Sequence, residues 1–351
     1  MVNQTMEALQ FNSKTQTLSL VTEKVPSVKE NEVLVKVAYA GVCGTDLHIV
    51  EGSFPCTDQP VILGHEFSGT VTAVGSKVTN VKVGDKVAVD PNRGCNTCGP
   101  CSGGQYHYCS TGGINSTIGI YCNGGWAQYC TAPDTQVYKL PENIALEQGA
   151  LTEPISCLSH GWDRVQPIPV GSSILITGAG IIGNLWACLL HVQGHRKVTI
   201  SEPLEDRRKI AEKLGTGFQV VSPAELKKQK EKDPEFGFDV AIECSGNGRA
   251  MEDALWMLNC GGKLCVFGVA SPDTRVSVSP YHLFKQEITI IAVNINPFSF
   301  PKALGFIDSM GTRYLEYEKL GIKTFPLKQH KEALEELKKG SIAKAIFKVE
   351  H

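Results

Sequence analysis

Residues 172–186 read SSILITGAGIIGNLW, and this stretch carries the strongest fold signal of the chain. An apolar run at 174–177 leads directly into a G-x-G-x-x-G pattern formed by Gly178, Gly180 and Gly183, and a helix-like run follows. In a dinucleotide-binding unit the first glycine permits a tight turn, the second lets backbone amides approach the pyrophosphate, and the third lets the helix lie close to the strand. The stretch therefore predicts the first βαβ unit of a nucleotide-binding parallel sheet.

An acidic residue completes this pattern. Glu202 follows Gly183 by nineteen residues and stands at the end of the next predicted strand, where its carboxylate can accept both ribose hydroxyls of adenosine and would repel a 2′-phosphate. Arg207 and Arg208 argue the other way, because either could pair with a phosphate, although both also fit the solvated face of a helix. We therefore predict NAD as cofactor in preference to NADP.

Further apolar strands alternate with helical segments after this unit. The strands are predicted at 238–246, 261–270 and 287–293, with a helix at 249–258 between the first two. Nearly continuous apolar strands are typical of parallel sheets covered on both faces. We therefore predict a doubly wound Rossmann domain over residues 155–293.

The segments before and after the predicted Rossmann domain have a different pattern of apolar residues. Residues 32–40 (EVLVKVAYA) and 71–89 show short alternating apolar runs with turn signals, and AIFKVE at 345–350 is strand-like. Short β-rich runs of this kind indicate an antiparallel, barrel-like domain. The predicted class is thus α/β, with a β-rich catalytic domain over 1–154, completed by 294–351, beside the Rossmann domain.

A first candidate metal site lies in the N-terminal part. Cys43, His65 and Glu66 offer a thiolate, an imidazole and a carboxylate, which are ligand types of Zn²⁺ sites that keep one position open for chemistry. A lone cysteine or histidine beside a glycine is more often packing or turn chemistry. The prediction of a catalytic zinc therefore depends on the other motifs of the chain.

A second metal motif is stronger. The run GCNTCGPCSGGQYHYC places Cys95, Cys98, Cys101 and Cys109 two, two and seven residues apart, and four such thiolates can fold around one tetrahedral zinc. The alternative is an iron–sulfur cluster, but in the bacterial ferredoxin pattern the fourth cysteine follows after three residues and precedes proline. Here Ser110 follows it, so a structural zinc is predicted. A nucleic-acid-binding zinc finger is disfavoured, because the histidine pair and basic face are missing.

The composition of the chain limits the classes of binding partner that it could have. The 351 residues are 42% hydrophobic and 20% charged with a net charge of −2, which makes no electrostatic case for nucleic acid or an anionic membrane. Neither a signal peptide nor a membrane span fits the sequence, so a cytoplasmic protein with a small-molecule partner is expected. Thirteen cysteines without a secretion signal argue for metal ligands rather than disulfides. Four others are predicted to be buried as small hydrophobic residues: Cys188, Cys244, Cys260 and Cys265.

Taken together, these residues resemble the zinc-dependent medium-chain alcohol dehydrogenase family over essentially the whole chain. The resemblance is closest to its polyol branch, which includes sorbitol, arabinitol, butanediol and threonine dehydrogenases. The matching segments are GVCGTDLH, GHEFSG, the four-cysteine run, TEPISC, GAGIIG and ISEP.

The resemblance implies two zinc ions per chain and a set of site residues. Cys43, His65 and Glu66 would hold the catalytic zinc, and Glu153 would join the metal directly or hold its bound water. It also places further residues beside the cofactor: Ile182, Arg207, Phe267, Gly268, Val269, Asn294, Ile295 and Asn296. A homodimer or homotetramer is what the family suggests.

The resemblance further implies reversible oxidation of a secondary hydroxyl, with hydride transfer to C4 of the nicotinamide. Thr45, two residues after Cys43, would accept the hydroxyl proton and pass it through the cofactor ribose to His48 and water. The alternative for His48 is a turn histidine without a relay role. Asp46 is expected to orient a ligand or the loop.

Two departures bear on the substrate. Animal sorbitol dehydrogenases have a tyrosine where this chain has Ile49, and an Arg-Tyr pair where it has Ile295 and Asn296, which puts sorbitol itself in doubt. The segment NINPFSFPKAL resembles arabinitol-type enzymes instead. A 2,3-butanediol or L-threonine dehydrogenase is the alternative enzyme. A non-catalytic zinc and dinucleotide-binding homologue is the alternative class, although every proposed catalytic position is filled.

Overall fold

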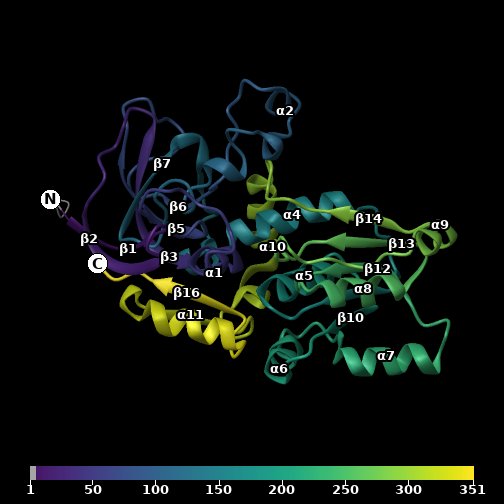
Figure 1. Cartoon of the computed structure of the whole chain (residues 1–351). Coiled ribbons are helices and arrows are strands. Elements are labelled where there is room, and N and C mark those ends of the chain that lie inside the picture. Colours follow the sequence, from purple (N-terminus) through teal and green to yellow (C-terminus); the bar gives the residue numbers. More distant parts are fainter. Residues whose placement is uncertain (1–4) are drawn as a thin grey trace.

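The computed structural model describes residues 5–351, in which the glycine-rich stretch opens a six-stranded parallel sheet (Figure 1). Strand β9 (Ile174–Thr177) leads through the glycine turn into helix α5 (Ile181–Val192). The other strands are β10 (Val198–Ser201), β11 (Gln219–Val221), β12 (Phe238–Glu243), β13 (Leu258–Val266) and β14 (Thr289–Ala292). The strand order is β11-β10-β9-β12-β13-β14. The chain therefore builds the sheet outward on one side of β9 and then on the other, beginning with β12, and at such a switch point a crevice opens beyond the carboxyl ends of the strands.

Helices cover both faces of this sheet. Successive residues of a strand point to opposite faces, so both faces carry apolar side chains that the helices bury. Ile174 and Ile176 of β9 face one apolar core with α5, whereas Leu175 faces a second core with Leu255. The helices that follow the strands are α6 (Glu205–Lys213), α7 (Pro223–Lys232), α8 (Gly248–Trp256) and α9 (Pro280–Gln286). The predicted doubly wound Rossmann fold is confirmed.

A separate set of β-sheets forms the other half of the molecule. A three-stranded sheet contains β1 (Thr5–Asn12), β2 (Thr17–Lys24) and β4 (Val61–Ile62). A larger sheet contains β3 (Glu32–Gly41), β5 (Phe67–Val74), β6 (Lys86–Val89), β7 (Tyr129–Pro133), β8 (Val137–Lys139), β15 (Ile322–Phe325) and β16 (Lys344–Lys348). Because β16 pairs antiparallel with β3, placing Ile346 opposite Gly41, the end of the chain lies beside the loop that carries Cys43.

The remaining helices connect the two halves or lie at their edges. They are α1 (Gly44–Val50), α2 (Gly99–Ser102), α3 (Leu146–Gly149), α4 (Thr152–Val165), α10 (Phe300–Leu315, broken at Gly311) and α11 (His330–Lys339). Short 3-10 helices lie at 106–108, 114–116, 134–136 and 327–329. Helices α4 and α10 share one apolar core with the parallel sheet, through Ile155 and Phe300 among others. Because α4 runs across position 154, the predicted domain bounds stay a prediction.

Among residues 5–351, no helix is both long and apolar enough to cross a bilayer. All thirteen cysteines are free. Cys188 and Cys265 are buried and Cys244 is half-buried, but Cys260 is exposed, so its predicted burial was wrong. The pairing of β13 with β12 jumps from Phe238–Leu258 to Val240–Lys263, which leaves Cys260 without a partner residue on β12.

Candidate active site

Three potential metal ligands meet although they come from two separate loops. Cys43 is the residue before helix α1, and His65 and Glu66 directly precede strand β5. One donor atom from each, the thiol sulfur, a ring nitrogen and a carboxylate oxygen, lie within 4.8 Å of one another. His65 and Glu66 are buried and Cys43 is half-buried. A soft, a borderline and a hard donor at this spacing fit a zinc ion.

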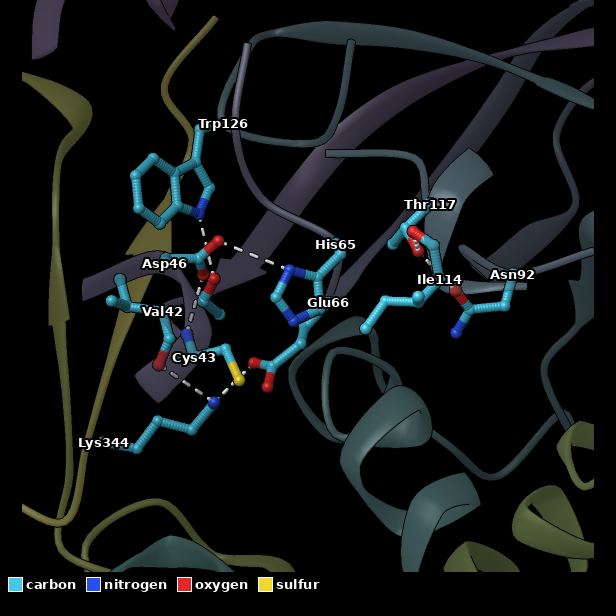
Figure 2. A network of polar contacts seen from close by, with 11 residues as sticks. Val42, Cys43, Asp46, His65, Glu66, Asn92, Ile114, Thr117, Trp126 and Lys344 are labelled. Carbon is cyan, nitrogen blue, oxygen red and sulfur yellow. Dashed lines mark hydrogen bonds and ion pairs between the residues drawn. The ribbon is translucent and has the colours of Figure 1, made fainter. Parts of the chain in front are cut away.

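Asp46 holds two of these residues in place. Its carboxylate accepts a hydrogen bond from the Cys43 amide at 2.8 Å, and its Oδ1 lies 3.3 Å from Nδ1 of His65 (Figure 2). Burial lowers the pKa of His65, but the nearby charges of Asp46 and Cys43 raise it by more. The net pKa of His65 is therefore well above its usual value. A carboxylate on one ring nitrogen leaves the other free to bind a metal, which is the common arrangement of ligating histidines.

Glu153 lies on the second position of α4 and lines the same cavity, which has a volume of about 420 Å³. Burial raises its pKa to about 7, although His65 lowers it and Glu66 raises it further. Its carboxylate is outside the 4.8 Å group formed by the other three residues. In this arrangement Glu153 is a neighbour of the donor set rather than one of its closest members.

Thr45 and His48 lie on successive turns of α1, and both line this cavity. Both side chains are half-buried, and Nδ1 of His48 is 3.4 Å from the Ser53 hydroxyl. The hydroxyl that is predicted to accept a proton and the imidazole that is predicted to deliver it to water therefore lie on one helix and line one cavity.

The four-cysteine run also forms a cluster. Cys95, Cys98, Cys101 and Cys109 bring their sulfur atoms within 4.8 Å of one another, and the sulfurs of Cys95 and Cys101 are 4.0 Å apart. Two sulfurs on one tetrahedral zinc would be separated by roughly 3.8 Å, given Zn–S bonds of about 2.3 Å. Hydrogen bonds from Thr97 lower the pKa of Cys95 to about 5, whereas the pKa of Cys98 is raised to about 12, because a backbone hydrogen bond from Cys101 that lowers it is outweighed by the neighbouring thiols.

Replacing Cys98 by serine is expected to destabilise the protein more than it slows the chemistry. Little apolar core surrounds this lobe, so a metal held by four thiolates would supply much of its folding free energy. We expect one zinc fewer per chain and a lower Tm, with the residual activity of the folded fraction retained. Metal analysis and thermal unfolding measure both effects. An unchanged Tm with full zinc content would show that the lobe does not depend on Cys98.

The glycine turn leaves space at the predicted phosphate-binding position. Gly178 has a φ of +95°, which favours glycine, and a Cβ at Gly183 would lie 1.9 Å from the carbonyl oxygen of Gly178. At Gly180 a Cβ would meet no atom within 4 Å. The turn is therefore closed where helix and strand meet and open at the amino end of α5, where an anion would bind.

Glu202 stands immediately after β10 and lines a second cavity of about 420 Å³. Its two carboxylate oxygens accept hydrogen bonds from the amides of Ala179 and Leu204, at 2.8 and 2.9 Å, so the side chain is held beside the glycine turn. The Arg208 guanidinium donates hydrogen bonds to the backbone oxygens of Glu202 and Pro203, and these contacts hold its side chain at the end of β10. Arg207 lines the cavity, as do Lys227 and Arg249, which both pair with Asp253.

The two cavities share Cys244 and Ser245 as lining residues, so they adjoin at the carboxyl end of β12. Most residues predicted beside the cofactor line the cavity that contains the metal donors: Ile182, Phe267, Gly268, Val269, Asn294 and Ile295. Asn296 lines neither cavity. It is fully buried, and its amide nitrogen donates to Asp90 at 3.1 Å and to Ser156 at 2.8 Å.

Some residues of the site were missed by the sequence analysis. Cys157 lines the metal-side cavity, and its sulfur lies 3.5 Å from the Glu153 carboxylate. Asn92 and Thr117 form a polar part of its wall, and Lys344 pairs with Glu66. Cys157 follows Glu153 by four residues, a helical spacing that could have revealed it. Lys344 is the first residue of strand β16, which also ends on a lysine, so no local pattern marks it.

Comparison with known families agrees with the geometry of both halves. Residues 29–142 match the family model of the alcohol dehydrogenase GroES-like domain, and residues 182–309 match that of the zinc-binding dehydrogenases. D-arabinitol dehydrogenase 1 of Uromyces fabae is 33% identical over 337 residues, which cover 95% of this chain and 94% of that protein. L-threonine 3-dehydrogenase of Pyrococcus furiosus is 35% identical over 273 residues, 76% of each chain.

Solved structures agree with the fold. A proposed zinc-binding dehydrogenase from Sinorhizobium meliloti 1021, with NADP bound, superposes with a TM-score of 0.87 at 29% identity, over 98% of this chain and 99% of that one.

Proposed function

The chain belongs to the zinc-dependent medium-chain alcohol dehydrogenase family, and from this premise we propose that it oxidises a secondary hydroxyl of a polyol with NAD, reversibly. One observation carries the proposal. The metal donors Cys43, His65 and Glu66 line the same cavity as the loop at 267–269 and the segment at 293–295, which follow strands of the Rossmann sheet. A hydroxyl held at the donors would thus face a nicotinamide held at the strand ends.

Each residue of this chain has a distinct part in the proposed reaction. Cys43, His65 and Glu66 would hold zinc, whose Lewis acidity would lower the pKa of the substrate hydroxyl. Thr45 accepts the proton of that hydroxyl, and His48 releases it toward water from the next turn of α1. The loops at 267–269 and 293–295 line the side of the cavity where the nicotinamide would lie.

The polar part of the cavity wall favours a substrate with several hydroxyls. The Thr117 hydroxyl donates to Oδ1 of Asn92 at 2.7 Å, and Nδ2 of Asn92 donates to Asn296 at 2.7 Å. A primary amide has two N–H donors and a hydroxyl oxygen keeps acceptor capacity, so these two side chains retain one donor and one acceptor. A second hydroxyl of a polyol could use both.

A threonine dehydrogenase is less consistent with this wall. Among the described residues that line the metal-side cavity there is neither an arginine nor a lysine. A buried amino-acid carboxylate would need such a charged partner. A 2,3-butanediol substrate would leave the remaining hydrogen-bond donor of Asn92 and acceptor of Thr117 without partners, which would lower its affinity.

An assay of NADH formation over pentitols, hexitols, 2,3-butanediol and L-threonine, with and without a metal chelator, tests the proposal. We expect the highest kcat/KM for a polyol and its loss after chelation. A highest kcat/KM for threonine would reject the polyol assignment. Absence of turnover with every substrate would favour the non-catalytic homologue.

Replacing Glu202 by alanine is expected to lower kcat/KM for NAD by about tenfold to a hundredfold, because two charge-assisted hydrogen bonds to the ribose would be lost. The value for NADP should fall less, since the repulsion of the 2′-phosphate disappears. Arg207→Ala is the matched control, and it should reduce NADP use selectively. Steady-state kinetics with both cofactors give the ratios. Equal kcat/KM for NAD and NADP in the wild-type enzyme would contradict the preference.

The predicted homodimer or homotetramer in the cytoplasm stays part of this proposal, and it rests on the resemblance of the chain to its family.

A further inference from the structure

Lys344 is a buried lysine in strand β16, with only 1% of its surface exposed. Its ammonium pairs with Oε2 of Glu66 and donates a hydrogen bond to the carbonyl oxygen of Val42 at 3.2 Å (Figure 2). Lysine is almost never fully buried unless it is paired, because desolvation of its charge is costly. The ion pair directly adjoins the proposed metal ligands, so its presence there requires a reason.

The backbone around the pair is built to accommodate it. Gly41 lies on β3 opposite Ile346, two residues beyond Lys344. A Cβ at Gly41 would lie 2.0 Å from Oε2 of Glu66 and 2.9 Å from Cε of Lys344. Any larger residue at position 41 would therefore displace the pair, so the space for the pair exists because position 41 is a glycine.

The charges near the donor set explain what the ammonium does. The ion pair with the Glu66 carboxylate compensates the cost of burying the Lys344 ammonium. Cys43 as a thiolate and Glu66 as a carboxylate would carry two negative charges, which a Zn²⁺ ion alone would neutralise. The Lys344 ammonium therefore adds one positive charge beside the donor set, although Lys344 does not itself line the cavity, and among the described residues no arginine or lysine does.

We propose that Lys344 is a positioning residue of the metal centre: its ammonium occupies one oxygen of Glu66, leaves the other for zinc, and weakens zinc binding by repulsion. The inference rests on the zinc site of the proposed function. A cation close to zinc withdraws negative charge from the ligands. The metal is then held less tightly and remains a stronger Lewis acid toward a substrate hydroxyl.

Release of zinc from the purified holoenzyme to a chromophoric chelator tests the proposal. Lys344→Met removes the charge at nearly constant volume, and Lys344→Arg keeps it. Two zinc sites should release zinc in two kinetic phases, and the phase that is absent in Cys43→Ala reports on the site formed by Cys43, His65 and Glu66. We expect that phase to be at least about tenfold slower in the methionine variant, because one repelling charge is gone from a partly desolvated site, and to be near the wild-type rate in the arginine variant.

A purely structural role predicts the opposite result, since a variant with an unpaired, disordered Glu66 should lose zinc faster. Faster or unchanged release in Lys344→Met would therefore overturn the proposal. If that variant does not fold, Lys344→Met/Glu66→Gln is compared with Glu66→Gln, where removal of both charges is tolerated better. Release from the double variant is again expected to be slower, and a faster rate refutes the repulsion.

Cobalt substitution gives a second readout. The visible d–d bands of Co²⁺ at this site should shift in Lys344→Met and be restored in Lys344→Arg, and identical spectra for all three proteins would count against an effect on the ligands. A wild-type protein that holds zinc only in the four-cysteine lobe would refute the proposed function and this inference together. Two zinc ions in the wild type with faster release from Lys344→Met would refute the inference alone.

Discussion

Replacing Cys43 by alanine is expected to remove one of two zinc ions per chain and to lower kcat/KM by at least about a thousandfold, because the polarisation of the substrate hydroxyl is lost. Cys43 supplies the only thiol among the three donors that lie within 4.8 Å of one another in its cluster. His65 and Glu66 would remain, but two ligands bind zinc much more weakly than three. Metal analysis and steady-state kinetics on the same preparation give both numbers.

A matched control separates this effect from the general loss of a thiol. Cys260 is exposed and lies outside both cavities, so Cys260→Ala should keep two zinc ions and wild-type activity. If Cys43→Ala retained both zinc ions, the assignment of the metal to this cluster would be wrong.

The second large effect is expected at Thr45. Thr45→Val should keep both zinc ions but reduce kcat by about 10²- to 10⁴-fold, because a positioned proton acceptor contributes that much to general base catalysis. Valine has nearly the shape of threonine, so the packing of α1 is preserved while the hydroxyl is lost. Single-turnover measurement of NADH formation isolates the chemical step.

Thr45→Ser restores the hydroxyl without the methyl group and should recover most of the rate. His48→Asn is expected to have a smaller effect than Thr45→Val, since water can replace a residue at the outer end of a relay. Unchanged turnover in Thr45→Val would remove Thr45 from the proposed mechanism.

The parts of the molecule that local sequence determines were predictable. A strand, a glycine turn and a helix are neighbours in the chain, so residues 172–186 were enough to predict the start of the Rossmann sheet, and spacing alone brought four cysteines into one group. In both cases the physical requirement, a close backbone approach or short loops between ligands, is met within a few residues.

Other features depended on contacts between distant segments. Lys344 meets Glu66 only because β16 returns to β3, and Asn296 is drawn into the interior by Asp90 and Ser156. The exposure of Cys260 follows from a shift in strand register that its own sequence does not reveal. Pairings of this kind depend on topology, and no local pattern at these positions encodes them.

The central claim is that hydride passes from a substrate carbon at the Cys43 cluster to a nicotinamide at the strand ends of the Rossmann sheet. Its most direct test uses a polyol deuterated at the oxidised carbon, with the reduced cofactor analysed by NMR. The account predicts one deuterium at C4 of the nicotinamide with the wild-type protein and none with Cys43→Ala. Absence of deuterium in NADH formed by the wild type, or equal labelling by Cys43→Ala, would contradict it.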